Sequence, residues 1–316
     1  MKHFLPVLLF VFCAFAFSVT AEAQTKPRLA VLPFSGGSEG DGNTISMVLS
    51  NQPALRNVFT VLPRTSNIEI LMREHDIERS GLTDSDTIAE LGKQLNADFV
   101  VSGHIQRLGD RDLVHITIVG VESLQQIAGM YQEYSSIEEI RGLLPTMAAK
   151  LVATTAANLD TINLPKLAVL PFDIPESVNL HDAETLAQIL ATELANSGKY
   201  AVLPRTSTIE AAMKEQDIQR SGLTDANSIK AIGKATNADY ALTGTVTNLG
   251  SLKLFLVQIL NVEDGSMLTG DDREYNTITE GLTLMPQISD KLTGLQDERE
   301  RARIAELARQ QQQEAE

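Results

Sequence analysis

Short apolar runs closed by proline recur along the chain and predict buried strands. The run LAVLPF occurs at residues 29–34 and again at residues 167–172. The hexapeptide VLPRTS, at residues 61–66 and 202–207, ends a second strand in each half of the chain. The segments NADFVVSG and NADYALTG then lead into a third strand.

A fourth strand alternates in polarity in each half. In the first half Val114, Ile116 and Ile118 form an apolar face. The opposite face holds Leu113, His115 and Thr117 in the first half and Leu254, Leu256 and Gln258 in the second. Because the two copies differ in polarity there, we expect this face to be half-exposed in both halves. An additional edge strand is expected at residues 129–134.

Helical periodicity is clearest in the second half. Residues 182–196 place Leu186, Ile189, Leu190 and Leu194 on one face and predict a helix. The first half shows no equally clear helix at the matching place. A further helix is expected to end near Leu95, and a final helix to begin near Pro145 or Pro286, because proline suits a first helical turn. The segments before these prolines are then separate short turns.

The chain is an internal duplication. Residues 61–109 align with residues 202–250 without a gap, at an offset of 141, and 27 of the 49 positions are identical. The repeat predicts an α/β fold of two tandem duplicated domains, each a mixed β-sheet packed with helices. The expected bounds are residues 24–162 and 163–294, followed by a charged Gln/Glu-rich helical tail at residues 295–316.

The N-terminus reads as a secretory signal at residues 1–23. Lys2 precedes an apolar run over residues 4–17, and Ala21-Glu22-Ala23 offers small residues at both positions that a signal peptidase reads. We therefore expect an exported, periplasmic protein. Lipidation of Cys13, the single cysteine, is the alternative, but Phe12 stands where a small residue is required. Membrane association is expected only if Cys13 is lipidated.

Charge and motif content narrow the chemistry. The formal net charge of −15 and the lack of a basic patch argue against nucleic acid. The histidines show no metal-ligand spacing, and the glycine-rich residues 35–42 lack the G-K-[ST] ending of a phosphate loop. Glu74 and Asp76, repeated as Glu215 and Asp217, stand two residues apart on an expected helix, so they do not share a face. We expect no catalytic residue, no cofactor and no metal site.

Most of the repeated hexapeptide is explained by helix capping. Ser66 and Ser207 each begin an S-x-x-E capping box. Helix capping does not explain the two arginines of the hexapeptide, Arg64 and Arg205. We interpret Arg64 and Arg205 as structural ion-pair partners of a carboxylate in their own half, or as an interaction site. The expected carboxylates are Asp84 or Glu69 for Arg64 and Asp225 or Glu210 for Arg205; anion binding by the arginines is the alternative.

The order of motifs resembles a known family. AVLPF, F-x-VLPR, E-x-DI-x-RSGLTD, GK-x-x-NAD and the glycine of SG or TG occur in this order twice. Together they resemble the CsgG/LpoB superfamily of bacterial envelope proteins, which includes a curli secretion component and a penicillin-binding-protein activator. The resemblance implies an α/β domain similar to anticodon-binding and TolB N-terminal domains, and a role in binding and assembly without catalysis.

The function expected from these features is a non-catalytic binding or scaffold protein of the periplasm or cell envelope. Its partner would be a periplasmic or outer-membrane protein whose identity the sequence leaves open. Two alternatives remain: a periplasmic hydrolase that uses the repeated acids, and a component of a CsgG-like secretion channel. The chain departs from channel-forming relatives in lacking a well-formed lipidation motif and in the compactness of its two units.

Overall fold

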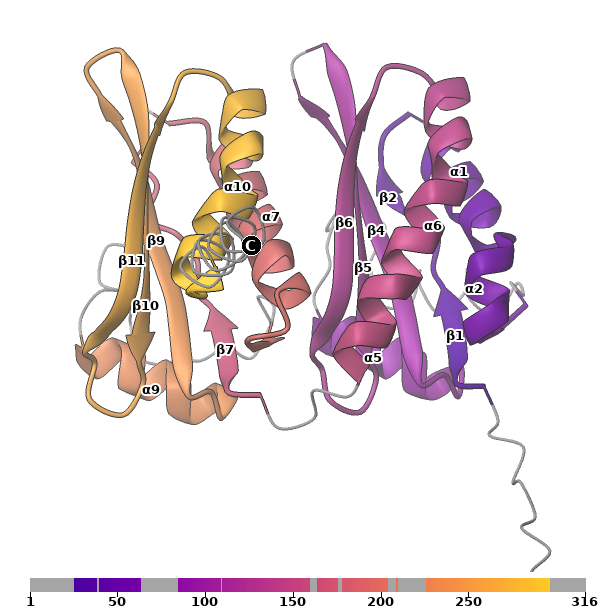
Figure 1. The fold of residues 1–316 in the computed structure, drawn as a ribbon, viewed down its shortest axis with the longest axis horizontal. Helices are drawn as coiled ribbons and strands as arrows, with labels where there is room; N and C mark the ends of the chain where they lie inside the picture. Colours follow the sequence, from indigo (N-terminus) through magenta and orange to yellow (C-terminus); the bar gives the residue numbers. More distant parts are fainter. Residues whose placement is uncertain are drawn as a thin grey trace, which may run out of the picture.

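The strands join into one continuous mixed sheet. The computed structural model describes residues 26–38, 40–63, 85–108, 110–159, 164–175, 178–203, 209 and 226–295. Its eleven-stranded sheet has the order β11-β10-β9-β7-β8-β6-β5-β4-β1-β3, with β2 paired to β4 off this path. Figure 1 shows the first half (residues 26–159) and the second half (residues 164–295) side by side in the same orientation.

The two halves follow a closely similar succession of elements. The first contains β1 (Arg28–Val31), β2 (Ser35–Gly36), α1 (Asp41–Ser50), α2 (Pro53–Val58), β3 (Thr60–Val61), α5 (Ser85–Gln94), β4 (Phe99–Leu108), β5 (Arg111–Gly120), β6 (Gln126–Tyr134) and α6 (Ile137–Leu159). The second contains β7 (Lys166–Val169), α7 (Leu180–Asn196), β8 (Ala201–Leu203), α9 (Ala226–Thr236), β9 (Tyr240–Leu249), β10 (Leu252–Asn261), β11 (Met267–Tyr275) and α10 (Ile278–Leu292). The mixed α/β class expected from the sequence is confirmed, whereas the domain boundaries stay a prediction because one sheet spans both halves.

The repeated NAD motif follows the end of a helix and makes a hydrogen bond to the first strand of each half. Asn96 and Asn237 both have φ of 52°, a left-handed conformation that asparagine tolerates where a helix stops. Two residues later, the Asp98 carboxylate accepts the backbone N–H of Arg28 at 2.7 Å. In the second half the Asp239 carboxylate accepts the backbone N–H of Lys166 at 2.8 Å. Each aspartate therefore links the start of one strand, β4 or β9, to the start of its neighbour, β1 or β7.

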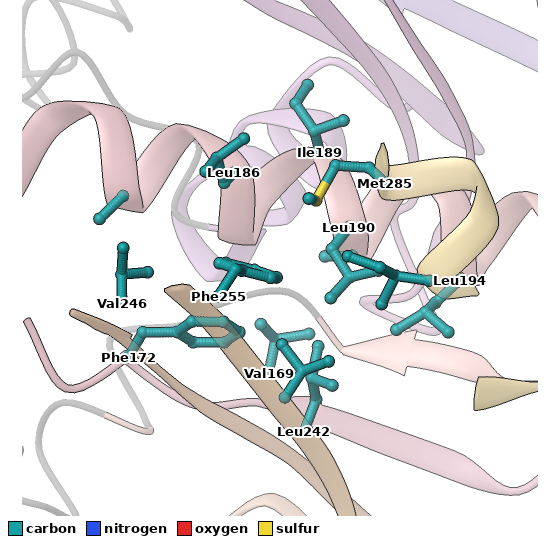
Figure 2. Close-up of a cluster of buried hydrophobic side chains, with 14 of the residues drawn as sticks. Val169, Phe172, Leu186, Ile189, Leu190, Leu194, Leu242, Val246, Phe255 and Met285 are labelled. Atoms are coloured by element: carbon teal, nitrogen blue, oxygen red, sulfur yellow. The ribbon is translucent and has the colours of Figure 1, made fainter. Parts of the chain in front are cut away.

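The phenylalanine of each LAVLPF run packs on a glycine of the neighbouring strand. A Cβ atom on Gly103 would lie 2.7 Å from the Phe34 ring, and one on Gly244 would lie 2.7 Å from the Phe172 ring. Only glycine leaves room for these rings. Phe172 in turn stacks on Phe255 with ring centroids 5.4 Å apart, at the centre of the second core (Figure 2).

Helices cover both faces of the sheet. In the first half α1, α2 and α6 pack on one face around Ile116, and α5 packs on the opposite face through Ile88 and Leu91. In the second half α7 and α10 cover the face that carries Phe255 (Figure 2). The periodicity that predicts α7 is confirmed, since Leu186, Ile189, Leu190 and Leu194 are all buried.

Two local predictions were wrong or incomplete. The segments before Pro145 and Pro286 are not separate turns, because α6 runs unbroken from Ile137 to Leu159 and α10 from Ile278 to Leu292, each with its proline inside. Proline removes one hydrogen bond to the carbonyl four residues earlier, and that residue, Arg141, is exposed, so water can satisfy its carbonyl. The strand expected at residues 129–134 begins earlier, at Gln126, and β11 repeats it in the second half.

Candidate binding surface

The four residues singled out from the sequence lie outside the described residues. They are Arg64, Asp84, Arg205 and Asp225. Their pairing as structural ion pairs or as an interaction site therefore stays a prediction. The described residues that follow each segment, α5 and α9, occupy matching places in the two halves.

Two histidines in the first half of the sheet lie opposite each other on neighbouring strands. His104 on β4 is in register with His115 on β5. Burial, with a smaller effect of the charge of His104, lowers the pKa of His115 to about 4. Burial likewise lowers the pKa of His104, with His181 as the second cause. Burial thus favours a neutral His115 imidazole at neutral pH, and its Nε2 lies 2.7 Å from the Thr192 hydroxyl.

Among the described residues, no three or more His, Cys, Asp or Glu side chains are grouped so that they could hold a metal ion. A search of the same residues finds no helix with the length and apolar character to cross a membrane.

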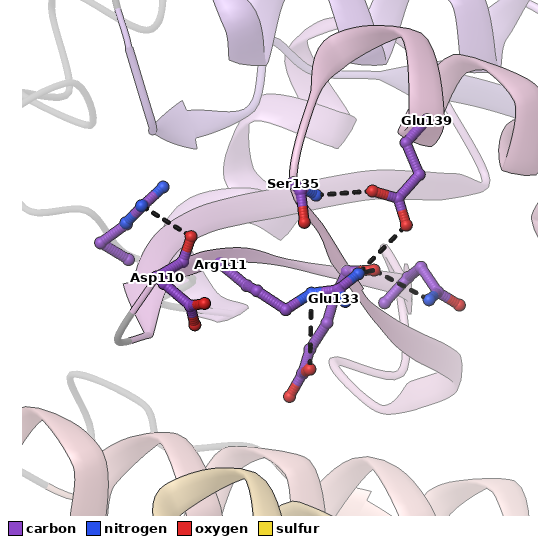
Figure 3. Close-up of polar contacts among 7 residues, drawn as sticks. Asp110, Arg111, Glu133, Ser135 and Glu139 are labelled. Carbon is purple, nitrogen blue, oxygen red and sulfur yellow. Dashed lines mark hydrogen bonds and ion pairs between the residues drawn. The ribbon is translucent and has the colours of Figure 1, made fainter.

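A charged network fastens the end of the β5–β6 hairpin to α6 (Figure 3). The Arg111 guanidinium donates to Glu139 Oε1 at 3.1 Å and lies 3.8 Å from Glu133 Oε2. Glu139 Oε2 accepts the backbone N–H of Ser135 at 2.8 Å, while the Glu139 N–H donates to the Ser136 hydroxyl at 3.2 Å. The S-x-x-E pattern of a capping box thus begins α6, and the network has a structural explanation.

The face of the first sheet that carries His115 is buried by a helix of the second half. Helix α7 lies across β6, and its Thr192 hydroxyl accepts from Gln126 Nε2 at 2.9 Å. Asn196 exchanges two hydrogen bonds with the backbone of Gly129, at 3.0 and 2.9 Å. On β4, Gln106 Nε2 donates to the Thr185 hydroxyl at 2.7 Å. We call this contact the junction.

The junction overturns the expectation of a half-exposed face in the first half. Leu113, His115 and Thr117 are all buried. Leu113 even belongs to the same apolar cluster as Phe172 and Phe255 of the second half. Helix α7 is therefore covered on two sides, by its own sheet and by that of the first half.

The junction also contains a partly buried tyrosine–carboxylate pair. The Tyr131 hydroxyl donates to the Glu193 carboxylate on α7. Burial raises the pKa of Glu193, against the opposing charge of Lys150 and the hydrogen bond from Tyr131. Burial raises the pKa of Tyr131 as well, and the charge of Glu193 adds to that effect. At neutral pH the tyrosine is a neutral donor, so the pair ties α7 to β6.

A cavity of about 490 Å³ lies beside the junction, between the first turn after β5 and the start of β8. Its wall includes Glu122, Gln126, Asn158 and Tyr200. Asn158 Nδ2 is already bonded to the carbonyls of Ile127 and Ala195. Two polar residues of this wall, Gln126 and Asn158, therefore already make hydrogen bonds to α7.

The matching face of the second half has no such cover in the described part of the chain. The offset of 141 places Leu256 where the first half has His115, and Met267 where it has Gln126. Leu256 is 38% exposed and Met267 64% exposed, whereas both counterparts are buried. Leu268, next to Met267 on β11, is also exposed. We call Leu256, Met267 and Leu268, with the outer edge of β11, the β11 face.

The sequence alone contained a signal for this difference. The junction positions of the first half are polar and find hydrogen-bond partners on α7. Two of these positions, His115 and Gln126, have the apolar counterparts Leu256 and Met267 in the second half. Large exposed apolar side chains that gather at one place on a soluble protein mark interaction surfaces. The β11 face is accordingly the candidate binding surface, and its geometry suits contact with another protein.

Comparisons with known proteins find similarity to one family over part of the chain. Residues 172–252 match the profile of the family described as curli production assembly/transport component CsgG. No curated protein matches the sequence.

Solved structures also resemble part of the chain. The LpoB C-terminal domain from Salmonella enterica is 16% identical, with a TM-score of 0.30, covering 39% of this chain and 92% of that one. The PelC dodecamer from Paraburkholderia phytofirmans is 18% identical, with a TM-score of 0.27, covering 41% and 88%. Lipoprotein GNA1162 from Neisseria meningitidis is 14% identical, with a TM-score of 0.29, covering 42% and 99%.

The family match lies within the second half. It begins at Phe172, in the loop after β7, and ends at Leu252, the first residue of β10. It includes the repeated RSGLTD and NAD motifs on which the resemblance was based. Residues 172–252 are thus similar to the CsgG family, in agreement with the resemblance to the CsgG/LpoB superfamily that the motifs indicate.

Proposed function

We propose that this protein is an exported, non-catalytic binding or scaffold protein of the cell envelope, and that the β11 face is where it binds another protein. The observation that carries the proposal is the contrast between the two halves. In the described part of the chain, the same sheet face is buried under α7 in the first half and has no such covering helix in the second, where Leu256 and Met267 stand in place of His115 and Gln126. Apolar side chains exposed on one face favour association because contact removes them from water.

The strand edge adds a second source of affinity. In the described part of the chain β11 ends the sheet, so its outer backbone N–H and C=O groups have no strand partner. An unpaired edge can take up a further strand through backbone hydrogen bonds. Asp271 and Asp272 on β11 make this edge acidic, with Asp271 paired to Arg273 at 3.0 Å. The partner surface is therefore expected to combine apolar side chains with positive charge.

Photo-crosslinking tests the binding surface in cells. A photoreactive amino acid in place of Met267 should yield a covalent adduct with a protein, because Met267 points away from the chain's own core. Leu180, at the start of α7, provides a matched control, since it is also apolar and 47% exposed but lies outside the β11 face. Adducts are detected by mass on a denaturing gel and identified by mass spectrometry.

The two positions should differ. We expect a discrete protein adduct from position 267 and none of comparable yield from position 180. No discrete adduct from either position, or equal adducts from both, would contradict a protein-binding role for the β11 face.

Export is a separate expected outcome. The mature protein should begin at Gln24 and carry no lipid, because the small residues Ala21 and Ala23 suit signal peptidase. Intact-mass measurement of protein purified from a periplasmic extract checks this. A mass that corresponds to acylation at Cys13 would instead place the protein on a membrane surface.

A further inference from the structure

The cavity beside the junction is built by both halves of the chain. The first half contributes the start of β4, the β5–β6 turn and the end of α6, with Phe99, Glu122 and Asn158. The second half contributes Ala195 on α7 and Tyr200 directly before β8. The volume of about 490 Å³ lies within the range of roughly 300–1,000 Å³ of small-molecule sites, which occur preferentially between domains. The cavity therefore has the size and the place of a ligand site.

Apolar side chains from both halves provide part of the wall. They are Phe99, Val121, Ile127, Leu159 and Leu164. Contact with these side chains removes the apolar part of a ligand from water, which favours binding. We therefore expect the ligand to have an apolar body.

Two aromatic pairs lie at matching places in the two halves, and one ring of each pair lines the cavity. The ring centroids of Phe59 and Phe99 are 5.9 Å apart, in an edge-to-face contact. Their counterparts at the offset of 141, Tyr200 and Tyr240, make the same kind of contact at 6.0 Å. Phe99 of the first pair and Tyr200 of the second belong to the cavity wall. The junction thus brings together two rings that belong to different halves.

The second half has a hydroxyl group where its ring lines the cavity. Phe59 is buried, whereas its counterpart Tyr200 is only partly buried. Burial raises the pKa of Tyr200, and the charge of Tyr240 adds to that effect. The Tyr200 hydroxyl is therefore neutral at neutral pH, and its oxygen can accept a hydrogen bond from a ligand.

The charged groups of the wall are acidic. Asp98 and Glu122 are both exposed and both line the cavity. Asp98 already accepts the backbone N–H of Arg28 through one oxygen, Oδ2. The described residues of the wall include no lysine, arginine or histidine. Carboxylates attract a cation, and so do the faces of aromatic rings, whereas an anion is repelled.

We propose that this cavity binds a small organic cation, a primary amine with an apolar body, and that the two halves hold the ligand between them. The apolar body would contact the rings and aliphatic side chains of the wall. The ammonium group would interact with Glu122 and donate a hydrogen bond to the Tyr200 hydroxyl. The site is separate from the β11 face.

The duplication explains why the site occurs at the junction. The second half repeats both acids, as Asp239 and Glu263. In the described part of the chain, however, β11 ends the sheet, so no further half places a ring opposite these acids. Glu263 therefore has the local sequence setting of Glu122 without the cavity, and it serves as the matched control.

Three probes that share a benzene ring test the class of ligand. They are phenethylammonium, its neutral analogue phenylethanol and its anionic analogue phenylpropionate. In the mature protein, labelled alanine methyl groups report binding through Ala97, Ala195 and Ala201, which line the cavity from both halves. Ala238, the counterpart of Ala97, is the internal control.

Only the cationic probe should bind appreciably. We expect phenethylammonium to shift the NMR signals of the three cavity methyl groups together and to leave Ala238 unchanged. The dissociation constant should be about 1 mM, as is usual for a ligand of this size. At saturation the probe should also raise the midpoint of thermal unfolding, because it binds only the folded protein.

Two variants assign the polar contacts. Glu122→Gln should weaken phenethylammonium binding by about two- to fivefold, since the ion pair is exposed. Tyr200→Phe restores the residue type of the first half and should weaken binding by about two- to tenfold through the lost hydrogen bond. Glu263→Gln should leave the affinity unchanged. Circular dichroism with thermal unfolding verifies that the three variants are folded.

The proposal fails if phenethylammonium leaves the three cavity methyl signals in place up to its solubility limit. Equal affinity for the three probes would also overturn it, because the charge of the ligand would then play no part. So would equal effects of Glu122→Gln and Glu263→Gln. Crosslinking at position 267 is independent of all these measurements, so the binding function of the β11 face and this site can fail separately.

Discussion

Leu113→Ala is expected to lower the free energy of unfolding by about 2–5 kcal/mol, the range for a fully buried leucine whose removal leaves a cavity. Leu113 lies on a strand of the first half but packs in the cluster that contains α7 of the second. The loss should therefore include contacts that cross the junction. Chemical denaturation with far-UV circular dichroism as the signal measures it.

The second half provides the matched control for this experiment. Leu254 occupies the same place on β10 that Leu113 occupies on β5, but it is only half-buried. Leu254→Ala should cost about 1 kcal/mol or less, since less apolar surface returns to water on unfolding. Equal losses for the two variants would show that α7 does not shield the first half in solution.

Acid is expected to destabilise this protein through His115. Its folded-state pKa is about 4, below the ordinary value of 6.5. As pH falls from 6.5, the unfolded chain binds a proton at this residue and the folded chain does not, so the contribution to stability is lost progressively down to about pH 4. The full difference corresponds to roughly 3 kcal/mol, from about 1.4 kcal/mol per pKa unit.

The variant His115→Leu isolates this effect from the titration of other groups. Leucine is the residue that the second half has at the matching position, Leu256, so the side chain suits this strand. The stability of the wild type relative to the variant, measured by denaturation at several pH values, should fall as pH decreases from 6.5 to 4. Parallel pH profiles for the two proteins would mean that His115 is accessible to protons in the folded state.

Local sequence patterns predicted the elements better than their partners. The alternation of Val114, Ile116 and Ile118 and the periodicity of α7 follow from which side of each element meets apolar neighbours, and both were confirmed. What covers the other side depends on which elements meet in space, and no local pattern contains that information. Hence the face around His115 was expected to be half-exposed.

The candidate site was less predictable for the same reason. Copies of one motif look equivalent in sequence, yet one copy lies at the junction and the other at the end of the sheet. Met267 is an ordinary strand residue by its pattern, and only the absence of a neighbour among the described elements makes it a candidate for binding. The pairing of Arg64 with Asp84 and of Arg205 with Asp225 stays a prediction.

The two-sided burial of α7 bears on the order in which the protein can be completed. The first half emerges first during synthesis, with the sheet face around Leu113 and His115 still bare. That face is covered only after the chain has been made as far as Asn196, the last residue of α7. Bare sheet faces are prone to aggregation. The N-terminal half therefore depends on its successor, and a chain stopped between the halves would be a substrate for chaperones and proteases.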